Sequence, residues 1–162
     1  MRLPLAIGAS LLISMGLTTP VFSRPPIRVT QARPSNSNLQ QLRVNQRLWN
    51  RQNITNYRYT LTRSCFCAPE AREPVVVEVR NGQTVSVTSV ATGQSVDPEL
   101  FKQYDTIPEL FKVIQDAIAK KADRLDIQYE PKLGYPTQIN IDYSFQIADE
   151  ELFITVENFQ AL

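Results

Sequence analysis

Two cysteines, Cys65 and Cys67, are the residues whose type and spacing most directly suggest chemistry. In an extended strand, residues two positions apart point their side chains to the same side. Their Cα atoms would lie about 6.5 to 7 Å apart, at the outer limit for a disulfide, so pairing requires a local pucker or bulge. Closing so small a ring restrains the unfolded chain by only about 1.6 kcal/mol. Stabilisation alone hardly explains such a bridge.

Three interpretations of this cysteine pair remain open. The first is a strained local disulfide, or two buried small side chains, without further function. The second is a reversible thiol–disulfide couple, which needs an accessible thiol with a lowered pKa and whose spacing differs from the Cys-x-x-Cys of thioredoxin-like proteins. The third is a soft-metal site, in which two thiolates suit two-coordinate copper better than four-coordinate zinc. We expect no bound metal or cofactor.

The chain contains no histidine. It therefore lacks the usual proton shuttle, the commonest metal ligand and the standard partner of a nucleophilic serine or cysteine. Carboxylates gather around the last predicted strand connection, but their spacing fits no calcium loop, and we expect a solvated turn there; these are Asp142, Asp149, Glu150 and Glu151. The sequence leaves enzymatic activity undecided and weighs against it.

Arg43, Arg47 and Arg51 lie four residues apart in a predicted helix, so they would form one row that could face an anionic surface. Charge is divided along the chain: residues 24–80 carry ten basic and three acidic side chains, and residues 81–162 carry six basic and thirteen acidic ones. Either the two halves lie against each other in the fold, or the row marks a partner-binding surface. Residues 24–162 have a net charge of zero, so we expect no nucleic-acid partner.

Residues 1–23 are typical of an export signal, with Arg2 at the start, an apolar run, and small residues at Val21 and Ser23 before the expected cleavage site. An uncleaved anchor is the alternative, because the uncharged run from Leu3 to Ser23 just reaches the length of a membrane span. The sequence predicts a polar, proline-rich disordered tail over 24–38 and a single folded domain over 39–162. We expect an exported protein, periplasmic or extracellular, with no transmembrane segment in the mature chain.

Hydrophobic periodicity predicts the elements that position these residues. A helix is expected over 39–52 and a second one after Thr106, which with Glu109 forms a capping box. Strands are expected over 57–67, 73–79, 83–90, 125–129, 139–143 and 152–156. The order α-βββ-α-βββ predicts an α+β fold, in which an antiparallel sheet of about six strands carries both main helices on one face.

Asn81-Gly82 is the strongest hairpin signal in the chain. A two-residue turn would place Val77 opposite Ser86 and mix the buried and exposed faces. A three-residue loop with a left-handed Gly82 instead pairs Val77 with Val85 and keeps the valines together, so we predict the three-residue, bulged loop.

Several motifs together resemble a family of small exported bacterial proteins that is catalogued only as a domain of unknown function. The residues that carry the resemblance are Trp49, Asn56-Tyr57-Arg58-Tyr59, Cys65-Phe66-Cys67, Asn81-Gly82, Ile107-Pro108-Glu109-Leu110-Phe111, Gly134-Tyr135-Pro136, Ile139-Asn140-Ile141-Asp142 and Asp149-Glu150-Glu151. The resemblance covers about residues 45–158. It implies an extracytoplasmic α+β domain and supplies no catalytic residue.

The sequence therefore predicts a non-enzymatic, exported binding module for a protein or cell-envelope partner. Its contact surface would be a face of the sheet or the arginine row of the first helix. Two alternatives remain: a thiol redox or soft-metal-handling protein that uses Cys65 and Cys67, and an inhibitor of a secreted enzyme.

Overall fold

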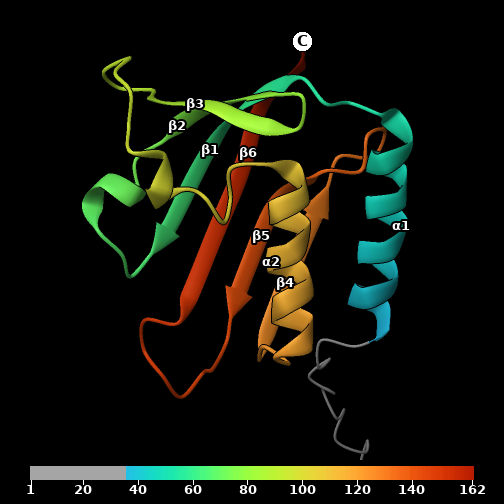
Figure 1. Ribbon diagram of the computed structural model, residues 1–162. Coiled ribbons are helices and arrows are strands. Elements are labelled where there is room, and N and C mark those ends of the chain that lie inside the picture. Colours follow the sequence, from blue (N-terminus) through green and yellow to red (C-terminus); the bar gives the residue numbers. More distant parts are fainter. Residues whose placement is uncertain (1–35) are drawn as a thin grey trace, which may run out of the picture. The chain divides into compact units, whose positions relative to one another are not determined.

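The computed structural model describes residues 36–162 (Figure 1), so the predicted leader and most of the predicted tail lie outside the described part. Two α-helices and six strands follow each other in the predicted order. Their bounds are α1 Asn36–Gln52, β1 Tyr57–Cys65, β2 Val75–Arg80, β3 Gln83–Ser89, α2 Ile107–Ala119, β4 Arg124–Tyr129, β5 Pro136–Asp142 and β6 Glu151–Ala161, with short 3-10 turns η1 Pro69–Ala71 and η2 Pro98–Leu100.

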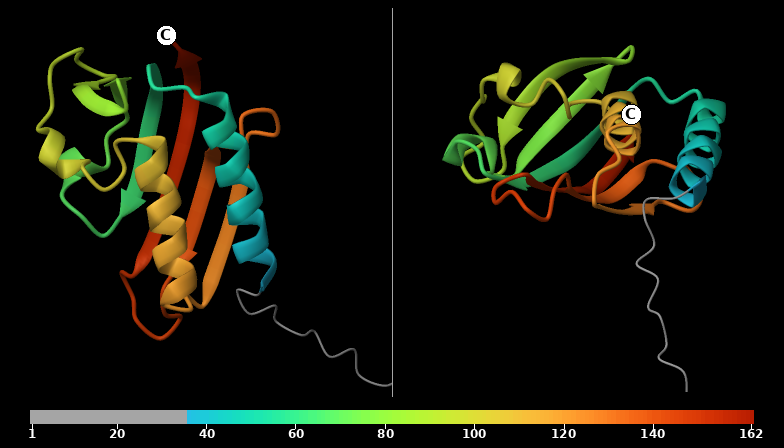
Figure 2. Two further views of the ribbon diagram at one scale, coloured as in Figure 1. Left: turned by 45° about the vertical axis from the view of Figure 1, so that its right-hand side comes forward. Right: turned by 90° about the horizontal axis from the view of Figure 1, so that it is seen from below.

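The six strands form one antiparallel sheet in the order β3-β2-β1-β6-β5-β4. The central pair, β1 and β6, joins the first three strands to the last three. Figure 2 shows that both helices lie against the same face of the sheet. The predicted α+β class, strand number and placement of the helices are therefore confirmed.

A single cluster of buried side chains fills the space between the sheet and the helices. Alternate residues of the central strands point into it, because side chains on a strand alternate between the two faces. Two tyrosines of β1 lie in this cluster: Tyr57 and Tyr59 are fully buried, and Tyr57 stacks near Phe159 and meets the edge of Trp49. The Tyr57 hydroxyl also accepts the backbone N–H of Ile107 at 3.1 Å, which ties β1 to the start of α2.

The second helix begins as the capping-box pattern predicted. The Thr106 hydroxyl accepts the N–H of Glu109 at 3.2 Å, and Pro108 occupies the first turn, where its missing N–H costs nothing. The apolar side chains of this helix form one buried stripe, from Ile107 through Leu110, Phe111 and Ile114 to Ala117.

The first helix begins three residues earlier than predicted. Asn36–Asn38, expected as the end of the tail, form its first turn. The sequence placed these polar residues in the tail, whereas the structure supplies a distant contact: the Asn38 side-chain amide donates to the carbonyl of Leu125 in β4 at 3.1 Å. This bond helps to hold the first turn against the sheet.

The prediction of a three-residue hairpin loop was wrong. Arg80 pairs with Gln83, so only Asn81 and Gly82 form the turn. Both have positive φ, 52° and 75°, as a type I′ turn requires. The extra residue lies instead within β3, where the register shifts and Val85 is left without a partner, so that Val77 faces Val87. The bulge at Val85, three residues after Gly82, restores the buried face from Val87 onward.

Candidate functional site

Cys65 and Cys67 form a disulfide at the end of β1. Their Cα atoms are 5.3 Å apart, closer than in an extended strand, because the chain turns after Cys65 and the N–H of Cys67 donates to the Cys65 carbonyl at 2.9 Å. The predicted local pucker is therefore present. The bridge closes a ring of three residues, which restrains the unfolded chain by only about 1.6 kcal/mol.

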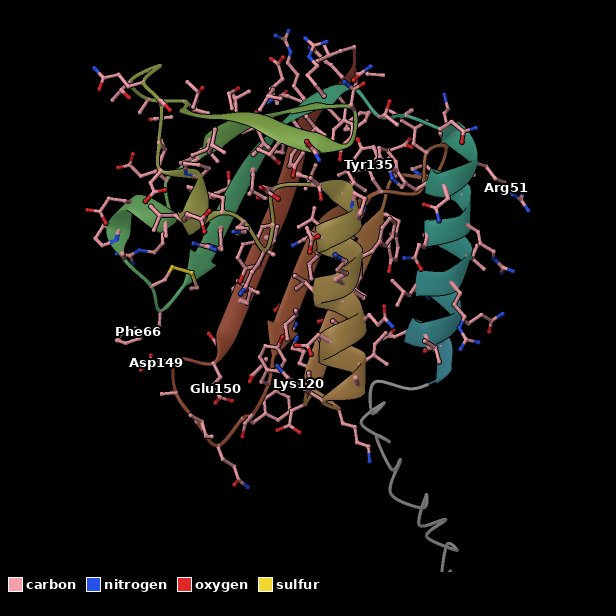
Figure 3. All side chains as sticks on the ribbon, viewed as in Figure 1. Arg51, Phe66, Lys120, Tyr135, Asp149 and Glu150 are labelled. Carbon is pink, nitrogen blue, oxygen red and sulfur yellow. A yellow bond between two sulfur atoms is a disulfide. The ribbon has the colours of Figure 1, made fainter. Side chains whose placement is uncertain are left out.

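The residue inside this ring, Phe66, is exposed by 80%. Register places it beside the start of β6, because Cys65 lies opposite Leu152 and Ser64 opposite Phe153. In Figure 3 the Phe66 side chain extends from the ring near Asp149 and Glu150. The sequence showed the aromatic residue between the cysteines, but its exposure could not be read from strand alternation.

The three arginines of the predicted row are all exposed on α1. The Arg47 side chain bonds the Arg43 carbonyl at 3.1 Å, and Arg51 points away from the sheet in Figure 3. Arg43 and Arg51 are eight positions apart in the helix, about 12 Å along its axis. Helix α1 contains no acidic residue, and among the described residues none of the three arginines has a carboxylate partner.

Ion pairs elsewhere form only within each half of the chain. Arg80 pairs with Glu78, Lys102 with Glu99, Lys112 with Glu109, Lys120 with Asp116 and Arg124 with Asp126, at 2.6 to 3.2 Å. No ion pair within residues 36–162 joins the basic first half to the acidic second half. The two halves do lie against each other, because β1 pairs with β6 and α1 bonds the carbonyls of Leu125 and Lys132, but they do so without an ion pair between them in the described part. The arginine row as a partner-binding surface stays a prediction.

The structure does not bring the two predicted sites together. Helix α1 lies at the β4 side of the sheet, where Asn38 bonds Leu125 and Gln52 donates to the carbonyl of Lys132. The disulfide closes the far end of β1, with β6 and β5 between it and β4. Figure 3 shows the disulfide and Arg51 on opposite sides of the described part. The cysteine pair and the arginine row are therefore separate features.

The predicted solvated turn between β5 and β6 carries Asp149 and Glu150, both exposed. Asp142 is buried and accepts the N–H of Ser144 at 3.1 Å, so it supports the turn rather than facing a ligand. Within the described part, no group of three or more cysteine or acidic side chains has the arrangement of a metal site.

A hollow of about 340 Å³ lies between edge strand β3 and residues 95–105. It is bounded by two hydrogen bonds, from the N–H of Val96 to the carbonyl of Val87 and from the Thr84 hydroxyl to the carbonyl of Asp105, both 2.9 Å. Burial raises the pKa of the Asp105 carboxyl. The other charged groups of its lining, Glu99 and Lys102, pair with each other.

Arg63 is a buried charge that the sequence analysis did not identify as part of the core. Its side chain donates to the carbonyls of Ala71 and Leu100, at 3.2 and 3.1 Å. The guanidinium lies over Tyr104 at 4.6 Å and near Phe101 at 5.4 Å. The Arg63 side chain therefore links both η1 and η2 to strand β1 of the sheet. A signal was present, because Arg63 has the same parity along β1 as the buried residues Tyr57, Tyr59 and Leu61.

Comparison with known families identifies the chain. The model of the "Family of unknown function (DUF6174)" matches residues 41–161. The chain belongs to the DUF6174 family. The match spans α1 to β6 almost completely, including the disulfide and the arginine row, and confirms the resemblance to a domain of unknown function. No curated protein and no solved structure matches this DUF6174 chain.

No helix within residues 36–162 of this DUF6174 protein is both long enough and apolar enough to cross a membrane. The leader that the sequence predicts over 1–23 lies outside the described residues, and its export role stays a prediction.

Proposed function

We propose that this DUF6174 protein is a non-enzymatic binding module that engages an anionic protein or cell-envelope partner through the arginine row of α1. One observation carries the proposal: Arg43, Arg47 and Arg51 are exposed in one row, and among residues 36–162 no carboxylate pairs with them. The three positive charges of the arginine row attract an anionic partner and raise its rate of association. This attraction becomes weaker as the salt concentration rises.

The outer face of the sheet, the other predicted surface, has weaker support. Its central strands carry many neutral polar side chains there, such as Thr60, Thr62, Asn140 and Thr155, each partly buried, and the charges beside them are of both signs, as with Arg58 and Glu157. Neutral hydroxyl and amide groups form hydrogen bonds with water and exert no long-range attraction on a charged partner. The charge imbalance of α1 therefore favours the helix over the sheet face.

The alternatives gain no comparable support. The disulfide is formed, and within residues 36–162 no group of three or more cysteine or acidic side chains has the arrangement of a metal site. An inhibitor of a secreted enzyme would need a defined contact surface, and the arginine row serves that role only if the enzyme is anionic there. Both alternatives stay predictions.

The test is binding of residues 24–162 to two anionic probes and one neutral probe. The probes are phosphatidylglycerol vesicles, a polyglutamate peptide and phosphatidylcholine vesicles, each at low and at high salt. The row variant replaces Arg43, Arg47 and Arg51 by glutamine, which preserves helix propensity. Each basic residue near an anionic membrane contributes about 1 kcal/mol, so the row variant should bind phosphatidylglycerol vesicles roughly 100-fold more weakly.

A matched control removes the same charge elsewhere. Lys102, Lys112 and Lys120 are exposed, and each already pairs with a carboxylate three or four residues away. Replacing these three by glutamine should leave binding within about threefold, because the groups lie outside α1 and exposed ion pairs contribute little. Binding to vesicles alone would identify an envelope partner, and binding to polyglutamate as well would identify acidic protein. Equal losses in both variants, or no loss in the row variant, would refute the proposal.

A further inference from the structure

Half of the exposed large apolar side chains within residues 36–162 gather at one end of the sheet. Phe66, Phe145, Ile147 and Phe153 are exposed by 80, 63, 53 and 41%. Four more exposed apolar residues lie elsewhere. We call the four residues of the sheet end the apolar tip.

Strand pairing brings the three chain segments of the apolar tip to the same end. Cys65 at the end of β1 lies opposite Leu152, and Asp142 at the end of β5 lies opposite Glu151. The disulfide ring, the β5–β6 connection and the start of β6 therefore meet there. A cluster of exposed apolar groups on a folded protein typically marks a contact surface, whereas isolated ones need no explanation.

The disulfide fixes how the apolar tip presents its most exposed residue. Both neighbours of Phe66 are held by the bridge, and the N–H of Cys67 bonds the Cys65 carbonyl at 2.9 Å. The ring is too small to contribute much to stability. Its larger physical effect is to hold the backbone of Phe66 in place before binding, which lowers the entropy lost when a partner closes over the phenyl ring.

The charges around the apolar tip select the kind of partner. Asp149, Glu150 and Glu151 are exposed at this end, and none of them forms an ion pair within residues 36–162. Two basic groups at this end already pair with other carboxylates: Arg124 on neighbouring β4 with Asp126 at 2.6 Å, and Lys120, whose Nζ lies over the Tyr143 ring, with Asp116 at 2.7 Å. Arg124 is also attracted to Glu151 but forms no ion pair with it. The chain has no basic residue after Lys132. Unpaired carboxylates beside exposed aromatic rings are repelled by an anionic bilayer and attracted by basic groups.

We propose that the apolar tip binds a protein whose surface has an apolar pocket rimmed by lysine or arginine, with Phe66 as the anchor in that pocket. An aromatic side chain seated in a desolvated pocket and enclosed by weaker polar contacts is the usual form of an interaction hot spot. This surface is separate from the arginine row and has the opposite charge preference.

The test is site-specific photocrosslinking in the cell that produces the protein. Benzoylphenylalanine is incorporated at Phe66 in the full chain, where it preserves the aromatic character of the ring. The matched control carries the same probe at Val85, which is 57% exposed near the Asn81-Gly82 turn, at the opposite end of β1. The crosslinked peptide is then sequenced.

The proposal expects one protein to be crosslinked from position 66 and not from position 85, at apolar residues flanked by lysine or arginine. Changing Asp149, Glu150 and Glu151 to lysine should abolish that crosslink. With the purified partner, Phe66→Ser should weaken binding at least 10-fold and Val85→Ser less than threefold. Crosslinks to lipid, to a second copy of this chain or to nothing at all would overturn the proposal, and so would a crosslink that survives the lysine changes.

The role of the disulfide in presenting Phe66 is tested separately. Replacing Cys65 and Cys67 by serine should keep Phe66 and still weaken binding several-fold, because the ring is no longer held in place. Thermal melting confirms that the variant is folded. Unchanged affinity in the folded double variant would overturn the role of the bridge in presenting Phe66.

Discussion

Tyr57 and Tyr129 offer a direct comparison of two buried hydroxyl groups. The Tyr57 hydroxyl accepts the N–H of Ile107 at 3.1 Å. The Tyr129 hydroxyl is buried and has no hydrogen-bond partner within residues 36–162. Replacing either tyrosine by phenylalanine removes a single oxygen and keeps the ring, so the two changes differ mainly in what that oxygen does.

The two substitutions should therefore have different effects on the free energy of unfolding. Tyr57→Phe leaves the N–H of Ile107 without its acceptor, and Ile107 is fully buried in the first turn of α2. A buried hydrogen-bond donor that is left without an acceptor lowers the free energy of unfolding by about 1 to 3 kcal/mol. Tyr129→Phe removes a hydroxyl that was desolvated without a protein partner, so it should be neutral or stabilise by up to about 1 kcal/mol.

Urea denaturation followed by circular dichroism measures both values. At about 4 °C per kcal/mol for a domain of this size, Tyr57→Phe should also lower the melting temperature by roughly 4 to 12 °C. Tyr143→Phe is the control: this residue is partly exposed, no hydrogen bond to its hydroxyl is present within residues 36–162, and stability should change by less than about 0.5 kcal/mol. If Tyr129→Phe destabilised as much as Tyr57→Phe, the hydrogen-bond reasoning would be refuted.

Two further predictions concern stability. Burial raises the pKa of Tyr57 to about 12 from 10.0, so between these pH values the unfolded chain loses a proton that the folded chain keeps. The free energy of unfolding should then fall by up to about 2 kcal/mol as pH rises from 10 to 12, and urea melts of Tyr57→Phe should lack this part of the slope. Gly82 and Gly134 both have positive φ, but a Cβ at Gly134 would meet the Asn45 carbonyl at 2.5 Å and Leu48 at 2.9 Å, whereas Gly82 has open space. Gly82→Ala should cost about 1 kcal/mol and Gly134→Ala at least twice that, and equal losses in the same melts would argue against the close approach to α1.

Local signals predicted much of the fold. The apolar stripe of α2 and the Thr106 cap act within one or two helical turns, so they can be read from neighbouring residues. The alternation of Tyr57, Tyr59 and Leu61 similarly requires only that β1 has one buried face. The Asn81-Gly82 turn was located correctly, but its length depended on a bulge at Val85 that the hairpin residues do not encode.

The candidate surfaces were predicted less completely, because each depends on distant neighbours. Helical spacing predicted that the arginines share one row, but only the structure shows that no carboxylate from another described element meets them. Likewise, the Cys-x-Cys spacing predicted a pucker if a bridge forms, while the exposure of Phe66 and its position beside the start of β6 follow from the pairing of β1 with β6.

The sequence by itself determined the order of the elements, the buried stripe of α2, the buried tyrosines and Leu61 of β1, and the positions of the Thr106 cap and the Asn81-Gly82 turn, since these depend on periodicity and on backbone preferences of nearby residues. Tertiary structure decided that Arg63 is buried against two carbonyls and two aromatic rings. It also decided which charges stay unpaired and which apolar groups stay exposed. The physical reason is that desolvation and ion pairing depend on what the fold brings within a few ångströms, and those neighbours come from parts of the chain far apart in sequence.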